Sequence, residues 1–174
     1  DARTGLWRLW GVSSIGTSDG VLVEIADLKE YTELSSHEAD WRQGEFVING
    51  ELTRPGEADV YRIGAAAGKP LHFWTLAAQI GGSHLDSVLI LRDASGNRLA
   101  EDDDVVAGQG TLIGNPDSSL FFTPQHDGPL FLTVKDRTGR GGPSYPYRLK
   151  VKRERHGFQL FTTPENFTVA RGDS

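Results

Sequence analysis

The chain has 174 residues, a formal net charge of −6 at pH 7 and no cysteine. The lack of cysteine excludes disulfide bridges, thiolate nucleophiles and cysteine-ligated zinc, and the acidic balance argues against nucleic acid as a partner. No apolar run is long enough to cross a membrane, so we expect no membrane insertion. The chain begins with Asp1 and contains no methionine, and we therefore expect it to be a segment of a longer protein.

Short apolar stretches of strand length follow one another along the chain. Residues 60–63 and 147–151 alternate apolar and charged side chains, which is typical of half-buried strands. Turn-forming runs, such as residues 54–57 and 126–129, separate these stretches. We predict an all-β fold, an antiparallel β-sandwich or jelly roll with extra terminal strands. The predicted strands are residues 7–12, 21–25, 46–52, 58–63, 71–76, 87–92, 120–123, 130–134 and 147–151.

The two ends and one internal segment differ from this pattern. Residues 28–43 are rich in charge and lack a clean apolar stripe, so we predict a linker with about one turn of helix. Residues 5–25 predict a hairpin with a polar tip, and residues 158–170 predict two strands around a turn. Neither end could bury a core alone, so we expect these ends to pack on the central domain or to belong to neighbouring domains.

Four motif-bearing segments follow one another in the central part of the chain. They are Val47-Ile48-Asn49-Gly50-Glu51-Leu52 with Asp59-Val60-Tyr61-Arg62-Ile63; Leu85-Asp86-Ser87-Val88-Leu89-Ile90-Leu91-Arg92-Asp93; Leu120-Phe121-Phe122-Thr123-Pro124 with Asp127-Gly128; and Leu132-Thr133-Val134-Lys135-Asp136 with Tyr147-Arg148-Leu149-Lys150-Val151. In this order residues 44–153 resemble the bacterial pre-peptidase C-terminal domain family, to which the collagen-binding domains of clostridial collagenases are related. The resemblance implies a β-sandwich module carried by a secreted peptidase or a large surface protein.

The ends carry a second resemblance. Residues 1–27 resemble the last two strands of an immunoglobulin-like domain, and residues 154–174 resemble the opening strand of another. This resemblance implies that flanking domains of the same parent protein are partners of the module. Arg171-Gly172-Asp173, which matches an adhesion-receptor tripeptide, also fits an ordinary turn, and three-residue motifs are common by chance.

Four consecutive carboxylates, Glu101, Asp102, Asp103 and Asp104, form the most distinctive charged cluster. Carboxylates this close repel one another, and calcium is the hard cation that accepts such oxygens in loose geometry. Asp86, Asp93 and Asp117 lie near strand ends in the same segments. These residues together form the predicted calcium site, and the alternative is a solvated acidic turn.

Sequence signals for catalysis are weak. No His-Glu-x-x-His and no Gly-x-Ser-x-Gly pattern occurs, so we predict that the chain is not an enzyme. The aromatic residues Trp41, Trp74 and Tyr145 are candidates for binding a polysaccharide or an extracellular protein.

Together these observations favour a non-catalytic, calcium-stabilised accessory module of a secreted or cell-surface bacterial protein. It would serve adhesion, substrate presentation or structural spacing. One alternative is a carbohydrate- or matrix-protein-binding domain attached to a secreted peptidase. Another is a subunit of a self-assembling extracellular fibre, since open strand edges permit self-association.

Overall fold

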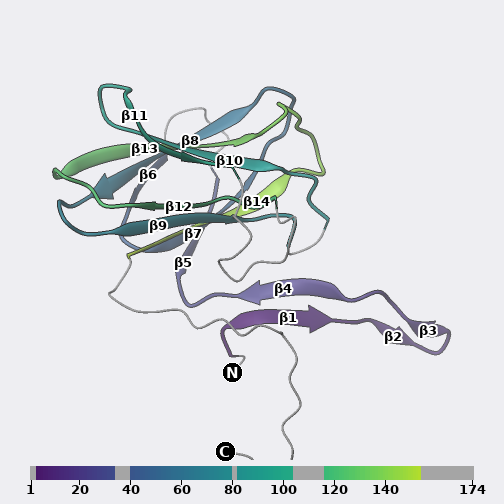
Figure 1. Cartoon of the computed structure of the whole chain (residues 1–174). Helices are drawn as coiled ribbons and strands as arrows, with labels where there is room; N and C mark the ends of the chain where they lie inside the picture. Colours follow the sequence, from purple (N-terminus) through teal and green to yellow (C-terminus); the bar gives the residue numbers. More distant parts are fainter. Residues whose placement is uncertain (1–2, 34–39, 80–81, 104–115, 154–174) are drawn as a thin grey trace, which may run out of the picture.

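The computed structural model describes residues 3–33, 40–79, 82–103 and 116–153, and within β6 the side chains of residues 40–42 are not described. Two five-stranded sheets face each other, and a ribbon of two paired strands extends beside them (Figure 1). Only strands and loops occur in these residues. No helix in the described part of the chain is long and apolar enough to span a membrane.

The first sheet has the strand order β11-β10-β13-β8-β6. Its members are β11 (Arg98–Asp102), β10 (Ser87–Arg92), β13 (Gly128–Asp136), β8 (Ala58–Ala65) and β6 (Asp40–Gln43). All neighbours are antiparallel except β6, which pairs parallel to β8 at one edge.

The second sheet has the strand order β12-β9-β14-β7-β5. Its members are β12 (Ser119–Phe122), β9 (Leu71–Leu76), β14 (Pro146–Arg153), β7 (Phe46–Glu51) and β5 (Lys29–Thr32). Here too the last strand, β5, pairs parallel to its neighbour. The sandwich therefore carries one added parallel strand on each sheet.

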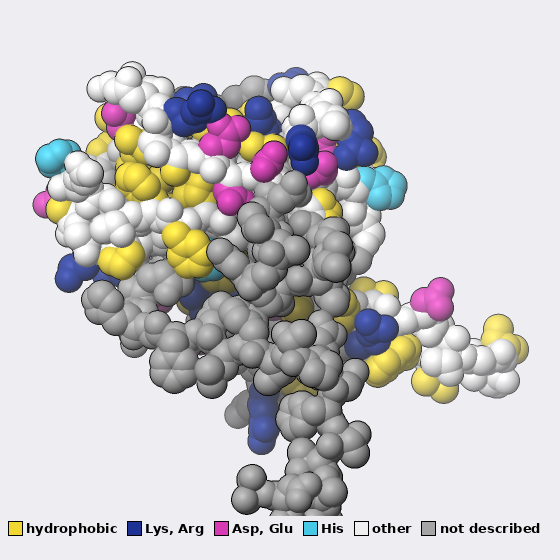
Figure 2. All heavy atoms as spheres, viewed as in Figure 1, with side chains coloured by type: hydrophobic (Ala, Val, Ile, Leu, Met, Phe, Trp, Pro, Cys, Tyr) yellow, Lys and Arg dark blue, Asp and Glu magenta, His cyan; other side chains and the backbone are white. Residues whose placement is uncertain are grey.

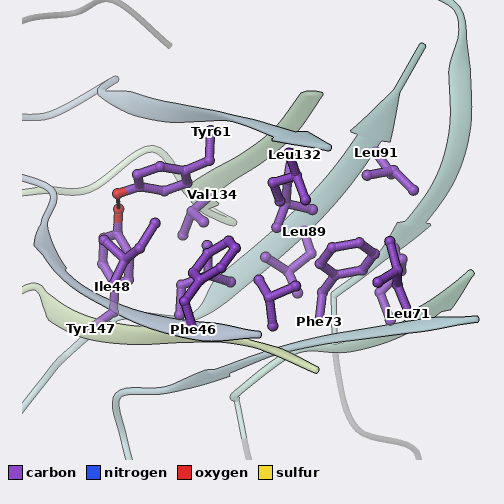
Figure 3. Packing of buried hydrophobic residues seen from close by; sticks show 14 of the residues in the cluster. Phe46, Ile48, Tyr61, Leu71, Phe73, Leu89, Leu91, Leu132, Val134 and Tyr147 are labelled. Carbon is purple, nitrogen blue, oxygen red and sulfur yellow. Dashed lines mark hydrogen bonds between the residues drawn. The ribbon is translucent and has the colours of Figure 1, made fainter. Parts of the chain in front are cut away.

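The core lies between the sheets because alternate residues of each strand point inward. Tyr61 and Ile63 of β8 are buried, whereas Val60 and Arg62, which alternate with them, are exposed. The inward residues of both sheets interdigitate, as Figure 3 shows for Leu89 and Leu132 on one side and Phe73 on the other. The predicted antiparallel β-sandwich is confirmed.

Three strands of the two five-stranded sheets occur where the sequence predicted none. β5 and β6 lie within residues 28–43, the predicted linker, and β11 contains Glu101 and Asp102 of the predicted acidic loop. β5 contributes one side chain to the core: Tyr31 packs edge-on against Phe46, with ring centroids 6.1 Å apart. β5 and β11 contain no fully buried side chain, so neither shows a clear alternating pattern in the sequence.

The N-terminal ribbon consists of β1 (Gly5–Leu9) paired antiparallel with β4 (Val21–Ile25). β2 (Val12–Ser13) and β3 (Gly16–Thr17) pair at its tip. The hairpin predicted for residues 5–25 is therefore confirmed. The predicted strands of residues 158–170 lie outside the described residues.

Candidate functional site

The ribbon has one face made only of apolar and glycine residues. Trp7 pairs with Val23 and Leu9 pairs with Val21, so these four side chains share a face. Their exposed fractions are 42% for Trp7, 37% for Val23, 56% for Leu9 and 60% for Val21. We call these four residues the apolar face. Figure 2 shows hydrophobic side chains at the surface of the ribbon where it projects from the sandwich.

The opposite face of the ribbon is tied to the sandwich by a carboxylate. Glu24 accepts a hydrogen bond from Nε of Arg148 at 3.1 Å and another from Nζ of Lys150, both on the outer side of β14. Glu30 of β5 accepts from Nη2 of the same arginine at 2.8 Å. Hydrogen bonding to Arg148 lowers the pKa of Glu30. We call this group of charges the anchor, because it joins the ribbon and the edge strand β5 to β14.

A stack of rings lies beside the anchor on the outer side of the second sheet. The His72 ring lies 3.9 Å from the Phe121 ring and 4.3 Å from the Trp74 ring, centroid to centroid, at interplanar angles of 9° and 21°. Nζ of Lys150 lies 5.1 Å from the centroid of Trp74. Burial lowers the pKa of His72 to about 4, so the imidazole is neutral at physiological pH.

The stack changes the interpretation of Trp74 as a ligand-binding residue. His72 and Lys150 both lie against its indole, so the ring is already engaged by protein groups. Phe121, which the sequence did not single out, is 55% exposed. The sequence contains a signal for the contact between His72 and Trp74. The two residues lie two apart on a predicted strand, so their side chains must share a face.

The predicted calcium ligands lie at both ends of β10. Asp93 follows β10 and closes a tight turn: Oδ1 accepts from the backbone N–H of Ser95 at 2.8 Å and of Asn97 at 2.9 Å. Gly96 adopts a φ of 85° there, which favours glycine. The side-chain amide of Asn97 lowers the pKa of Asp93 by a further hydrogen bond. Asp93 is therefore a turn residue, separated by the length of β10 from Asp86.

Asp86, Asp103 and Asp117 lie toward the other end of β10. Asp102 pairs with Leu89, so the chain at Asp103 runs toward the start of β10. Asp117 lies beside that start, because the carbonyl of Pro116 accepts from the N–H of Ser87 at 3.0 Å. The strand topology thus brings part of the predicted set to one end and leaves Asp93 at the other.

Several of these carboxylates already accept hydrogen bonds or pair with basic side chains. Asp117 is buried and accepts from the backbone N–H groups of Ala77, Ala78 and Gln79 at 3.0, 3.1 and 3.3 Å. Burial raises the pKa of Asp117 despite these donors. Oδ1 of Asp102 accepts from the N–H of Ser119 at 3.1 Å.

Two further described members, Glu101 and Asp103, are exposed. Glu101 pairs with Arg98, and Oδ2 of Asp103 lies 3.8 Å from Nε of Arg137. Among the described residues, no group of three or more His, Asp or Glu side chains is placed to hold a metal ion. Asp104 lies outside the described residues, so calcium binding stays a prediction.

Asp136, which the sequence reasoning did not select, organises the loop at the same end. Its Oδ1 accepts from the N–H groups of Thr138 and Arg140 at 3.0 and 2.9 Å, and its Oδ2 accepts from the N–H of Asp86 at 3.2 Å. Burial acts to raise the pKa of Asp136, but the hydrogen bonds from Arg140 and Thr138 outweigh it and lower the pKa to about 2. An Asp at the start of a Gly-rich turn is the sequence signal for such a role.

Tyr145, the third predicted ligand-binding aromatic, lies in the loop that Asp136 organises. Its ring is half-buried against the core and stands edge-on to His84 at 6.1 Å. The guanidinium carbon of Arg140 lies 5.8 Å from the Tyr145 centroid. Trp41 lies in β6, but its side chain is outside the described residues. Within the described residues, the three predicted aromatic side chains therefore do not come together as one ligand-binding surface.

No protein-family model matches the sequence, and no curated protein sequence matches it. The structure is similar to the pre-peptidase C-terminal domain of a collagenase from Bacillus anthracis, with a TM-score of 0.50 and 20% identity over 69% of this chain and 100% of that domain. A periplasmic inhibitor of g-type lysozyme from Aeromonas hydrophila is similar at 17% identity over 72% of this chain and 96% of that chain. Its TM-score of 0.43 is too low for a fold assignment. The expected resemblance is thus confirmed for the fold. Over 69% of its length, this chain has the sandwich fold of a pre-peptidase C-terminal domain.

Proposed function

We propose that this chain is a non-catalytic accessory module of a secreted or cell-surface multidomain bacterial protein, and that its apolar face docks on a neighbouring β domain of that protein. One observation carries the proposal. The ribbon is held to the sandwich by Glu24 on one face, and it exposes Trp7, Leu9, Val21 and Val23 on the other. An exposed, uncharged strand face of this kind marks an interaction site.

The energetics favour a covered apolar face. A two-stranded ribbon is only marginally stable in water by itself. Fully burying a Val, Leu or aromatic side chain stabilises by roughly 1.5–3 kcal/mol relative to full exposure. Because these four side chains are already partly covered, a docked partner sheet would add on the order of 1 kcal/mol for each. The partner that fits is another apolar sheet face, packed at about 10 Å as in a sandwich.

The location and the accessory role are supported by two observations. The sandwich has the fold of a domain from a bacterial collagenase, and the ribbon resembles the last strands of an immunoglobulin-like domain. We propose that the neighbour on the apolar face is the rest of that immunoglobulin-like domain. Adhesion, substrate presentation and spacing are the roles that such a rigid junction would serve.

Hydrogen exchange of the full chain, alone and within its longer parent protein, tests the docking. The backbone N–H groups of β1 and β4 are expected to exchange at least about tenfold more slowly in the parent protein. Equal exchange in both would overturn the proposal. Sedimentation of the chain alone tests the alternative of a self-assembling fibre. If the chain forms a dimer or polymer at higher concentration, and the N–H groups of β1 and β4 become protected from exchange in it, that alternative replaces docking on a neighbouring domain.

Calcium binding is proposed for the acidic segment at the β11 end. Four consecutive carboxylates support it, together with the position of Asp86 and Asp117 near that end. Calcium bound there would neutralise the repulsion between the carboxylates and stabilise the folded chain. Asp93 is not part of this proposal, because it lies at the opposite end of β10.

A second candidate function is binding of a polysaccharide or matrix protein through Phe121. The exposed Phe121 ring is held in place by stacking on His72, and a positioned aromatic ring is a common anchor for such ligands. A glycan and matrix-protein array probed with the wild-type chain and with Phe121→Ala tests it. Loss of a signal in Phe121→Ala but not in Leu99→Ala, an exposed residue of the other sheet, would support it.

A further inference from the structure

A row of basic and aromatic side chains crosses the outer face of the first sheet. Phe131 of β13 pairs with Arg92 of β10 on one side and with Arg62 of β8 on the other. Residues paired across neighbouring strands point to the same face of a sheet. The neighbours of Phe131 along β13, Leu130 and Leu132, are buried in the core, so the three paired residues point away from it. We call Arg62, Phe131 and Arg92 the basic row.

The side chains of the basic row reach the solvent on the side of the sandwich away from the ribbon. Arg62 is exposed, and Phe131 and Arg92 are half-buried. The ribbon is held on the outer side of the second sheet by Glu24, so the first sheet turns its outer face in the opposite direction (Figure 1). The basic row is therefore separate from the apolar face and from the Phe121 ring, which belongs to the second sheet.

The strand register places like charges opposite each other at one end of the basic row. Arg98 of β11 pairs with Arg92, and like charges directly opposite on neighbouring strands destabilise a sheet. Glu101 forms an ion pair with Arg98, whereas Arg92 forms no ion pair with any residue in the described part of the chain. A local conflict of this kind is typical of a functional site, and a bound anion would relieve it.

The spacing of the two arginines in the basic row indicates the kind of anion. Arg62 and Arg92 lie on either side of β13, so their Cα atoms are roughly 10 Å apart. A guanidinium holds a carboxylate through paired N–H donors. Negative groups at this separation occur in a linear polysaccharide that carries one carboxylate on every second sugar. The sugar between the two carboxylates would then lie over Phe131.

We propose that the basic row binds an acidic polysaccharide with one carboxylate on every second sugar. Arg62 and Arg92 each hold a carboxylate, and Phe131 packs against the sugar between them. A single-stranded nucleic acid fits this surface less well. The chain has a net charge of −6, which repels a polymer with a phosphate on every nucleotide more strongly, and the basic row has one ring where successive bases need several.

Calorimetric titration of the wild-type chain with a hyaluronan hexasaccharide, which has one carboxylate on every second sugar, tests the proposal. Binding is expected at low ionic strength and should weaken as the salt concentration rises from about 0.02 M to 0.15 M, because salt screens exposed charges. A neutral hexasaccharide of N-acetylglucosamine should not bind. If hyaluronan does not bind, if the neutral sugar binds equally well, or if oligothymidylate binds in place of hyaluronan, the proposal is overturned.

Two variants and a matched control separate the basic row from a general effect of net charge. Arg62→Gln and Arg92→Gln each remove one guanidinium, and each is expected to weaken hyaluronan binding at least about fivefold. Arg153→Gln removes the same charge from the exposed end of β14 in the second sheet and should change the affinity less than about twofold. An equal loss of affinity in all three variants overturns the proposal.

A measurement on the wild-type chain decides the question even if neither variant folds. When the hyaluronan hexasaccharide is added, the backbone N–H signals of residues 62, 92 and 131 are expected to shift in the NMR spectrum. Phe121→Ala should leave these shifts and the affinity unchanged, because Phe121 belongs to the second sheet. Unchanged signals at all three positions, with shifts only in strands of the second sheet, overturn the proposal.

Discussion

The Glu24 carboxylate and the Arg148 guanidinium, which are 124 residues apart in sequence, meet at 3.1 Å on the outer face of the second sheet. The Glu24 side chain is only 8% exposed, although it belongs to a ribbon that otherwise exposes apolar residues. This pair decides which face of the ribbon turns toward the sandwich. The remaining face is then left for a partner.

Removing the Glu24 charge should detach the ribbon. Glu24→Gln leaves the mostly buried Arg148 and Lys150 side chains, which are 15% and 10% exposed, without this carboxylate. We expect a loss of about 1–3 kcal/mol in the free energy of unfolding, less than for a fully buried pair. Urea denaturation followed by circular dichroism measures it. Glu101→Gln, whose pair with Arg98 is exposed, should cost no more than about 1 kcal/mol. If the two variants lose the same free energy of unfolding, Glu24 does not anchor the ribbon.

Asp136 should support stability in a pH-dependent way. Because its folded pKa is about 2, below the ordinary value of 3.8, its contribution is present above pH 4 and is lost as pH falls through 2. Asp136→Asn should lower stability at pH 7 by about 2 kcal/mol, since several hydrogen bonds to a charged group are weakened. The difference between wild type and variant should vanish toward pH 2. A constant difference from pH 7 to pH 2 would contradict this role.

The Phe121 ring should control the ionisation of His72. Burial holds the pKa of His72 at about 4, and Phe121 covers one side of the imidazole at 3.9 Å. Phe121→Ala should raise the pKa of His72 toward 6.5, measured by NMR titration. Stability of the wild type should fall as pH drops from 6.5 to 4, because only the unfolded state gains the proton there. Leu99→Ala, on the other sheet, should leave the titration of His72 unchanged.

Calcium should raise the melting temperature through the acidic segment. A concentration about ten times the dissociation constant adds roughly 1.4 kcal/mol, which corresponds to about 3–6 °C for a chain of this size. Asp103→Asn should reduce the shift. Asp93→Asn should lower the starting melting temperature by loosening its turn but leave the calcium-induced shift intact. If neither millimolar calcium nor a chelator changes the melting temperature, the predicted calcium site is wrong.

Local patterns were sufficient to predict the strands that build the core, such as β8 and β14, because burial imposes strict alternation on long inner strands. They did not reveal β5, β6 or β11; in β5 and β11 no side chain is fully buried, so no alternating pattern marks the strand. The contacts of Glu24 with Arg148 and of Tyr147 with Asp59 depend on which strands become neighbours, and no local signal encodes that. The predicted calcium ligands include a run of four acidic residues in the sequence, but the direction of β10 places Asp93 apart from Asp86, Asp103 and Asp117.

The docking claim is tested most directly by a matched pair of valines. Val23 on the apolar face and Val60 on the outer side of β8 are both 37% exposed. In the chain alone, Val23→Ser and Val60→Ser should each cost less than about 1 kcal/mol. In the longer parent protein, we predict that Val23→Ser costs about 1–2 kcal/mol more than in the chain alone, because a docked sheet covers it, while the cost of Val60→Ser stays the same. An unchanged cost for Val23→Ser would contradict docking through the ribbon.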